Sequence, residues 1–341
     1  MLNRRCFLRQ TSCALVSLGA GQSTTPVRVS KTQVFYDPAM LRHEPPNDHP
    51  ESPKRLDAVM TAVHQLERQG RVSIMTPRPA TEDDLLLVHS PDYLKKVRTE
   101  IASGRPVLST GDTDISPGSL AAALAAAGTV VSAVNAVIAG VTPTAFCAVR
   151  PPGHHASQAR GMGFCVFNNI AIGARHARRR HGVERVLIVD WDVHHGNGTQ
   201  EVFWNDGSLL FFDVHQHPWY PGTGSSDEQG EGRGRGLIVN NPLPAGSGRT
   251  AIFKVFREGL VPAVERFKPE LVMISAGFDS RAGDPLGRFT LTDQDFADLT
   301  DVVSAIARLH AGGRIVSVLE GGYALDGLSR AVASHLERLA A

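Results

Sequence analysis

Five short apolar runs constrain the fold more than any other feature of the sequence. They are rich in Val, Ile, Leu and Phe and do not alternate with polar positions, which is typical of parallel strands covered on both faces. The runs cover residues 144–149, 185–189, 208–212, 271–275 and 314–319. Segments with helical character cover residues 119–140, 168–181, 250–267 and 292–311. Strands that alternate with helices predict an α/β fold with a parallel sheet.

Polar residues follow each of these runs. The letters that come directly after them are RPPGHH, DWDVHHGNG, DVHQHPWYPGTG, AGFDS and EGGY. In an open α/β sheet, ligands bind at the carboxyl ends of the strands. The sequence therefore predicts that titratable and aromatic side chains from separate segments gather at one edge of the sheet.

The segment DWDVHH indicates a metal site. Asp190, Asp192 and His194 share parity, so in an extended chain their side chains would point to one side. Buried acids and imidazoles are costly without a metal or polar partners, whereas capping of a strand end or turn is the alternative for any single acid. Asp279 follows another strand and is the natural third ligand beside Asp192 and His194. Three ligands with one open position are the arrangement of a catalytic zinc site.

A histidine pair and a tyrosine suit the hydrolysis of an amide. His154 and His155 can supply a base for an attacking water and an acid for a leaving amine. Each imidazole needs an orienting partner, for which Asp190 and Asn197 are candidates. Tyr323 follows two glycines, which allow its phenol to project into a pocket and donate to a developing oxyanion. A tyrosine packed on a surface turn is the alternative.

The first 25 residues differ from the rest of the chain. They contain Arg4, Arg5 and Arg9, no acid, and a short apolar stretch at 13–21. This stretch is too short to span a bilayer, and a basic start before a short apolar region is typical of an export signal. The letters NRRCFLR resemble a twin-arginine signal, which predicts a periplasmic or extracellular protein. The alternative is a cytoplasmic protein with a basic N-terminus.

Residues 31–341 show no linker or repeat and are expected to form one domain. Lys plus Arg number 35 and Asp plus Glu number 34, so the chain has no basic excess and we expect no nucleic-acid partner. We also expect no membrane span. Cys147 lies in an apolar run and is expected to pack in the core. Only Cys165 remains with it beyond the expected signal, so at most one disulfide is possible.

The sequence blocks together resemble the histone deacetylase and acetylpolyamine amidohydrolase family of the arginase-deacetylase superfamily. The blocks are HPESPKRL, RPPGHHA, MGFCVFNN, VDWDVHHGNGT, YPGTG, SAGFD, DPLG and LEGGY, and the resemblance runs from about Val34 to Leu339. It implies a single arginase-deacetylase α/β domain with a central parallel sheet of about eight strands, flanked by helices. Asn197 and the wording of the blocks resemble the class II branch.

The resemblance implies a catalytic set around one metal ion, Zn²⁺ or Fe²⁺. The ligands that it implies are Asp192, His194 and Asp279. His155 would act as general base and acid, with His154 mainly as its electrostatic partner. Asp190 would pair with His154, and Asn197 with His155. Tyr323 would polarise the substrate carbonyl.

The resemblance also implies a substrate channel and two further sites. The residues that would line the channel for the acyl-lysine stem are Gly163, Phe164, Tyr220 and Leu286. Arg55 would lie near an internal acetate cavity. A potassium ion near the zinc loop would be bound in the region of Asp190, Asp192, His194, Asp213 and Val214.

These features predict zinc-dependent removal of acetate from acetyl-lysine, an acetylpolyamine or a related acylated amine. Leu286 stands where one type of polyamine-specialised relative has Glu, which weakens the polyamine reading without excluding it. Asp112 or Asp114 could grip the substrate backbone or amine. An arginase-like ureohydrolase, which would need two metals, and a silent protein that binds acylated ligands are the alternatives. No metal ligand, dyad histidine or tyrosine is missing, which favours an enzyme.

Overall fold

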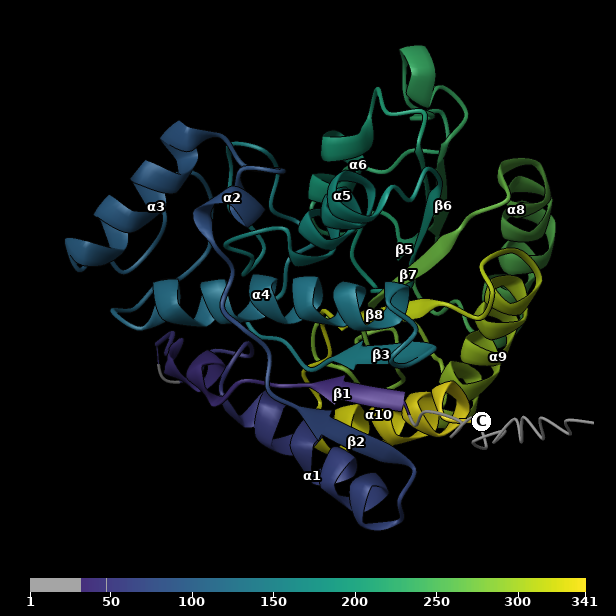
Figure 1. The fold of residues 1–341 in the computed structure, drawn as a ribbon, viewed down its shortest axis with the longest axis horizontal. Helices are drawn as coiled ribbons and strands as arrows, with labels where there is room; N and C mark the ends of the chain where they lie inside the picture. The colour runs from purple at the N-terminus through teal and green to yellow at the C-terminus, as the bar shows by residue number, and fades with distance from the viewer. Residues whose placement is uncertain (1–31, 47) are drawn as a thin grey trace, which may run out of the picture.

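An eight-stranded parallel sheet organises the chain (Figure 1). The computed structural model describes residues 32–341 except residue 47, so the expected export signal at 1–25 lies outside the described residues. The strand order is β2-β1-β3-β8-β7-β4-β5-β6, and all paired neighbours are parallel. The strands are β1 (Thr32–Phe35), β2 (Val72–Met75), β3 (Thr144–Cys147), β4 (Val186–Asp190), β5 (Leu209–Gln216), β6 (Ile238–Leu243), β7 (Leu271–Ala276) and β8 (Ile315–Leu319). The predicted α/β class and the sheet of about eight strands are confirmed.

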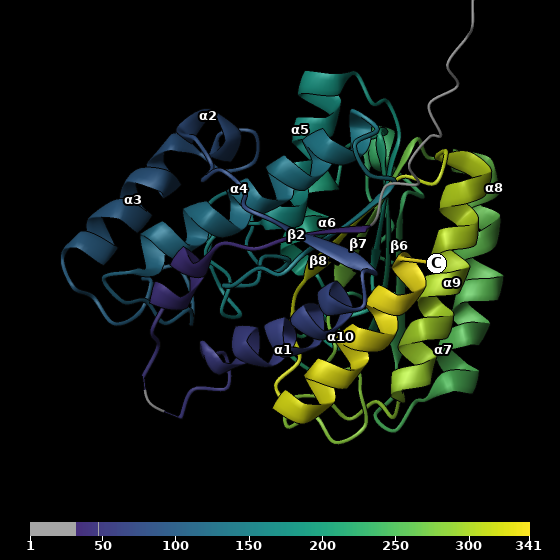
Figure 2. The ribbon, with the colours of Figure 1, turned by 60° about the horizontal axis from the view of Figure 1, so that its bottom comes forward.

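Helices cover both faces of the sheet (Figures 1 and 2). One face carries α1 (Lys54–Arg68), α7 (Arg249–Val255), α8 (Val261–Phe267), α9 (Asp293–His310) and α10 (Leu325–Leu339). The other carries α4 (Ser119–Ile138), α5 (Asn169–His181) and α6 (Asn197–Phe203), while α2 (Glu82–Leu85) and α3 (Pro91–Ala102) extend beyond α4. Short 3₁₀ segments lie at Pro38–Arg42 and Gly232–Gly234.

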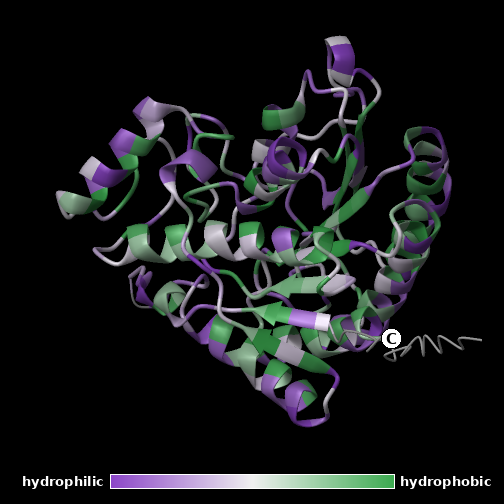
Figure 3. Ribbon diagram, in the orientation of Figure 1, coloured by the Kyte–Doolittle hydropathy of each residue, from purple (hydrophilic) through white to green (hydrophobic). Residues whose placement is uncertain are grey.

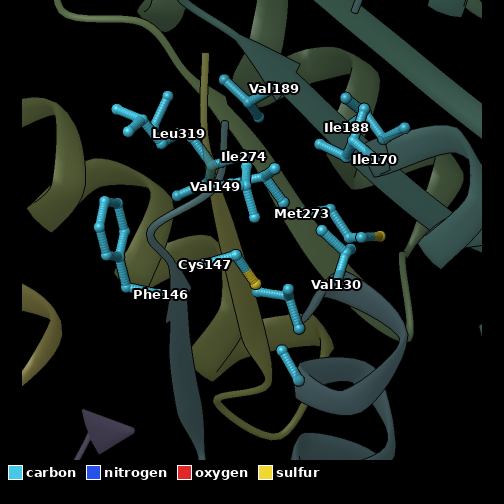
Figure 4. Packing of buried hydrophobic residues seen from close by; sticks show 14 of the residues in the cluster. Val130, Phe146, Cys147, Val149, Ile170, Ile188, Val189, Met273, Ile274 and Leu319 are labelled. Atoms are coloured by element: carbon cyan, nitrogen blue, oxygen red, sulfur yellow. The ribbon is translucent and has the colours of Figure 1, made fainter. Parts of the chain in front are cut away.

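The core lies between the sheet and these helices. Figure 3 shows apolar residues concentrated on the strands and on α4. Figure 4 shows Val130 of α4 and Ile170 of α5 packed with Ile188 of β4 and Met273 of β7. Cys147 is fully buried in this core, as predicted, and both it and Cys165 carry free thiols.

By length and composition alone, α4 could cross a membrane. It is the one described helix of this kind, and 67% of its apolar window is buried inside the protein. Contacts with α5, β3 and β8 account for its apolar sequence.

Several elements differ from the prediction for identifiable reasons. The single helix expected at 250–267 is interrupted by a π-helical turn at Phe256–Leu260, which ends two residues before Pro262, and this proline has no N–H to donate to an α-helical hydrogen bond. The edge strand β6 was not predicted, because its letters IVNNPL contain a proline and form no apolar run. Strand β5 continues through the polar residues Asp213, His215 and Gln216, which are buried.

His335 of α10 provides a test of the packing between α9, α10 and the sheet. The side chain is fully buried, with Nδ1 2.6 Å from the Thr300 hydroxyl of α9 and Nε2 2.8 Å from the Ser317 hydroxyl of β8. Burial lowers the pKa of His335 to about 3, from 6.5. Between these pH values the unfolded chain binds one more proton at this site than the folded chain does, so stability falls as the pH falls.

We therefore expect the His335→Gln variant to lose less stability in acid than the wild type. Between pH 7 and pH 5 the free energy of unfolding should fall by ~2 kcal/mol more in the wild type than in the variant. Urea unfolding of both proteins at the two pH values measures this difference. Other buried histidines are present in both proteins and cancel in the comparison. Equal pH dependence of the two proteins would contradict the assignment.

Candidate metal centre and its pocket

The candidate site lies where four neighbouring strands end. The strands β3, β8, β7 and β4 are adjacent in the sheet, and each is followed by a segment that contributes polar side chains. These segments contain His154 and His155 after β3, Tyr323 after β8, Asp279 after β7 and Asp192 with His194 after β4. The gathering of these groups at one edge follows from the parallel topology.

Asp192, His194 and Asp279 form a candidate metal site. Their ligating atoms lie within 4.8 Å of one another, and all three residues are buried. The Nδ1 atom of His194 lies 2.9 Å from Asp192 Oδ1 and 3.2 Å from Asp279 Oδ2. This is the one cluster of three or more His, Cys, Asp or Glu ligands among the residues that the structure describes.

The local backbone differs from the extended chain that the sequence suggested. Strand β4 ends at Asp190, and the following residues turn. The backbone N–H of Asp192 donates to Asp190 Oδ1, and that of His194 donates to Asp192 Oδ1. Asp192 and His194 therefore meet because carboxylates hold the turn, and the argument from strand parity was wrong about the geometry.

The three residues fit a tetrahedral ion. Bonds of about 2.0–2.1 Å to such an ion separate its ligands by about 3.3 Å, close to the spacing of His194 and Asp279. Asp279 Oδ2 is buried and has no hydrogen-bond partner, while Asp279 Oδ1 accepts from the N–H of Val193. Burial and the charge of Asp192 raise the pKa of Asp279 to about 7. A cation between the two carboxylates would relieve this repulsion.

Two glycines leave room for these carboxylates. A Cβ at Gly277 would overlap the side chain of Asp192, and one at Gly321 would overlap the carboxylates of both Asp192 and Asp279. The Gly321 N–H donates to Asp192 Oδ2 at 2.8 Å. The glycines in AGFD and EGGY are therefore explained by the close approach of backbone to the metal ligands.

Each histidine of the pair has its own orienting partner. His154 Nδ1 lies 2.9 Å from Asp190 Oδ2, and His155 Nδ1 lies 2.8 Å from Asn197 Oδ1. The two rings lie with centroids 4.0 Å apart. Glu320, which the sequence did not single out, accepts from the backbone N–H of His154 at 3.1 Å and so fixes the pair to the end of β8.

The environment separates the pKa values of the two histidines. Burial alone would lower the pKa of His154, but the charges of Asp190 and Asp192 outweigh it and raise that pKa well above its usual value. Burial and the neighbouring His154 and His194 lower the pKa of His155 well below its usual value. The pKa values of the two histidines are therefore shifted in opposite directions, so His154 holds a proton more readily than His155 does.

Tyr323 is held against the site by its backbone and by an arginine. Its N–H donates to Asp284 Oδ2 at 2.7 Å, and Gly322 before it has φ of 119°. The guanidinium of Arg55 lies 4.8 Å from the centre of the phenol ring, and its Nε donates to the Gly322 carbonyl at 2.7 Å. Burial raises the pKa of Tyr323 well above its usual value, so the hydroxyl keeps its proton.

A pocket of about 270 Å³ opens onto these groups. Its lining residues are Asp112, His155, Gly163, Phe164, His194, Trp219, Tyr220, Leu286 and Tyr323. The four residues for which the sequence predicted a channel are among them. Trp219 was not predicted, and its role depends on a tertiary contact, because its Nε1 donates to the Leu286 carbonyl at 2.8 Å.

Gly163 is required at its place in the wall. It has φ of 56°, and a Cβ there would overlap the ring of His155. Its N–H donates to Asp112 Oδ1 at 2.8 Å, and the Tyr220 hydroxyl donates to the same oxygen at 3.2 Å. Asp114, by contrast, has its Oδ2 3.2 Å from His49 Nε2 and does not line the pocket.

Arg55 belongs to a buried charged cluster beneath Tyr323. Glu51 lies 3.2 Å from Arg55 Nη1 and 2.7 Å from Arg150 Nε, and His43 Nε2 lies 3.4 Å from the same carboxylate group. Glu51 and Arg150 were not singled out from the sequence, although both lie in blocks that carried the resemblance. The cluster gives the interior beneath the pocket an excess of positive charge.

The region expected to bind potassium is also assembled. Asp190 of β4 and Asp213 of β5 are register partners, and Val214 follows in β5. Asp213 Oδ2 accepts from the Gly196 N–H at 2.9 Å, so β5 is tied to the turn that carries His194.

Comparisons with known proteins show the family to which the chain is similar. The histone deacetylase domain family matches residues 49–339. A probable deacetylase of Archaeoglobus fulgidus is 40% identical over 301 residues, covering 87% of this chain and 82% of the relative. The histone deacetylase-like amidohydrolase of Pseudomonas aeruginosa is 40% identical over 276 residues, covering 81% and 72%.

Two further comparisons concern a polyamine enzyme and the fold. The polyamine deacetylase HDAC10 of Homo sapiens is 40% identical over 300 residues, and the match covers 85% of this chain and 44% of that protein. The crystal structure of the HDA15 HD domain superposes with a TM-score of 0.85 at 36% identity, covering 91% of this chain and 90% of that one.

Proposed function

Because the chain belongs to the histone deacetylase domain family, we propose that it is a zinc-dependent deacylase that removes acetate from an acetylated amine. The observation that carries the proposal is the convergence of Asp192, His194 and Asp279 beside the histidine pair on one pocket. The printed names of the relatives as deacetylases and amidohydrolases support the same reaction type.

Asp192, His194 and Asp279 would hold one zinc ion, with an open position toward the pocket. When bound, the ion would supply a Lewis acid for the amide carbonyl and lower the pKa of the attacking water. Asp190 would hold the turn that carries Asp192 and His194 in place, because its Oδ1 accepts a hydrogen bond from the Asp192 N–H.

His155 would transfer the protons. Its Nδ1 is occupied by Asn197, so Nε2 is the ring nitrogen available to take a proton from the attacking water. The lowered pKa of His155 keeps it neutral and ready for this step near pH 7. His154, whose pKa the charges of Asp190 and Asp192 raise, would stabilise the negative charge that develops and support return of the proton to the leaving amine.

Tyr323 would donate its hydroxyl proton in a hydrogen bond to the substrate carbonyl oxygen, where charge develops. Arg55 would keep the ring in place through its contacts with the phenol and with Gly322, and its charge would suit the acetate product. Phe164 and Tyr220 would contact the methylene stem of the substrate. Asp112 would accept a hydrogen bond from the substrate near the pocket rim.

A potassium ion held through Asp190, Asp213 and the backbone near His194 would stiffen the turn that carries the metal ligands. Because of Asn197, we also propose that the chain belongs to the class II branch of the family. Export through the twin-arginine route remains our proposal for residues 1–25. A reporter fused to residues 1–30 tests it, because cytoplasmic retention, or export that is indifferent to Arg4→Lys with Arg5→Lys, would reject it.

Acetate release by the purified zinc-loaded protein tests the proposed function. An acetyl-lysine peptide and N-acetylputrescine are the candidate substrates, and arginine serves as the contrasting substrate. We expect acetate from at least one of the first two and no urea from arginine. Urea release would favour a ureohydrolase, and tight binding of the peptide without any turnover would favour a silent binding protein.

A further inference from the structure

Arg288 is a cation next to the pocket, in contact with a residue of its lining, that neither the fold nor the reaction described above accounts for. It is exposed, and its guanidinium carbon lies 5.2 Å from the centre of the Trp219 ring, which lines the pocket. Throughout the described ranges 32–46 and 48–341, its guanidinium makes no ion pair. A cation that lies against a residue of the pocket wall and has no counter-ion is available to a ligand.

The backbone around Arg288 is fixed on both sides. Its N–H donates to Gln216 Oε1 at the end of β5 at 2.9 Å, and its carbonyl accepts from the Gly246 N–H at 2.8 Å. Two residues earlier, the Leu286 carbonyl accepts from the Trp219 indole and its N–H donates to Asp284. The arginine, the tryptophan and the pocket wall are therefore one connected unit, which lowers the entropic cost of using Arg288 for binding.

The chemistry of a guanidinium without a partner favours a carboxylate ligand. Its carbon lies over the Trp219 ring, and the N–H donors along the edge of the group make no hydrogen bond to another residue in the described part of the chain. Such an edge matches the two oxygens of a carboxylate in a bidentate contact. The pocket wall beside it, Leu286 and Trp219, is apolar, and the acid that lines the pocket, Asp112, already accepts from the Gly163 N–H and the Tyr220 hydroxyl.

We infer that Arg288 selects acylated amines that carry a carboxylate at the end remote from the acyl group. This inference rests on the proposed function and narrows it. A substrate with its acyl group at the metal site and methylenes along Phe164 and Tyr220 reaches the rim with its far end. Nε-acetyl-lysine with a free α-carboxylate, as an amino acid or at a peptide C-terminus, has this chemistry. Electrostatic repulsion from the charge of Arg288 disfavours the binding of an acetylated polyamine, whose only charged groups are cations.

Three matched substrates test the inference. Nε-acetyl-lysine, its α-carboxamide and N-acetylcadaverine share the acyl group and the methylene stem, and they differ in the carboxylate alone. Steady-state acetate release by the zinc-loaded protein should give a kcat/KM for the acid about tenfold above that for the amide, with N-acetylcadaverine lowest. The difference should lie mainly in KM, because the contact is remote from the reacting carbonyl.

The Arg288→Gln variant separates binding by the charge from a structural role. It should lower kcat/KM for the acid about tenfold and bring acid and amide to within about twofold of each other, and Arg288→Lys should restore part of the preference. The matched control is Arg257→Gln, which removes an exposed arginine in the π-helical turn and should keep the preference for the acid.

Hydrolysis of the amide as fast as the acid by the wild type would overturn the inference and leave the deacylase function standing. Equal losses for acid and amide in Arg288→Gln would also overturn it, because they would indicate a structural role. No hydrolysis of any of the three substrates, with no hydrolysis of the substrates tested under Proposed function, would overturn the deacylase function itself and this inference with it.

Discussion

Replacement of Asp192 by asparagine is expected to abolish zinc binding and to lower kcat/KM for acetate release by about 10³-fold or more. Asparagine keeps the shape of the side chain and one acceptor oxygen, so it can retain one of the two hydrogen bonds that the His194 N–H donates to Oδ1 and the Gly321 N–H donates to Oδ2. What it removes is the charge that faces Asp279. A neutral amide is a poor zinc ligand, so the remaining two ligands should not retain the ion.

Two measurements on the Asp192→Asn variant test this expectation: the zinc bound per chain, by mass spectrometry, and the rate of acetate release. The matched control is Asp92→Asn, which changes an exposed acid in the first turn of α3, far from the pocket lining. Circular dichroism should show the same helical content in wild type and both variants. A variant at Asp192 that keeps stoichiometric zinc and more than a tenth of the activity would show that the ion binds elsewhere.

Replacement of Tyr323 by phenylalanine is expected to lower kcat by about 10²–10³-fold with little change in KM. The ring and its contact with Arg55 are retained, and only the hydroxyl that would donate to the developing oxyanion is lost. Because no described side chain accepts a hydrogen bond from this hydroxyl, its removal leaves no buried partner unsatisfied among residues 32–46 and 48–341. Zinc content should remain that of the wild type.

Tyr220→Phe is the comparison for Tyr323→Phe inside the same pocket. Its hydroxyl donates to Asp112 rather than toward the metal ligands, so its loss should affect KM more than kcat. Steady-state kinetics on one acetylated substrate distinguish the two variants. A Tyr323→Phe variant whose kcat stays within fivefold of the wild type would remove this residue from the catalytic set.

The sequence predicted those parts of the fold that are local. Unbroken apolar runs marked five of the eight strands, and Thr292 at the start of the segment 292–311 marked α9, whose first turn it caps. Strands β1 and β2 were not predicted because their letters TQVF and VSIM include polar residues and form no unbroken apolar run, and β6 was not predicted because of Pro242. Edge and short strands carry little periodicity, so pairing with neighbours decides them.

The site shows the same division between local and tertiary information. Asp192, His194 and Asp279 could be proposed from their places after strands, since parallel topology brings strand ends together. Glu320 and Trp219 could not be proposed from the sequence, because the role of each depends on a partner distant in sequence. The partner of Glu320 is the His154 N–H, and that of Trp219 is the Leu286 carbonyl. The turn at 190–194 depends on carboxylate hydrogen bonds that a count of parity does not contain.

Titration of the metal-free protein with zinc, followed by acetate release, tests the central claim most directly. The account predicts that the metal-free protein is inactive, that activity rises linearly with added zinc, and that it reaches its plateau at one ion per chain. Full activity without metal, or a plateau that requires two ions per chain, would contradict the assignment of Asp192, His194 and Asp279 as the single catalytic metal site.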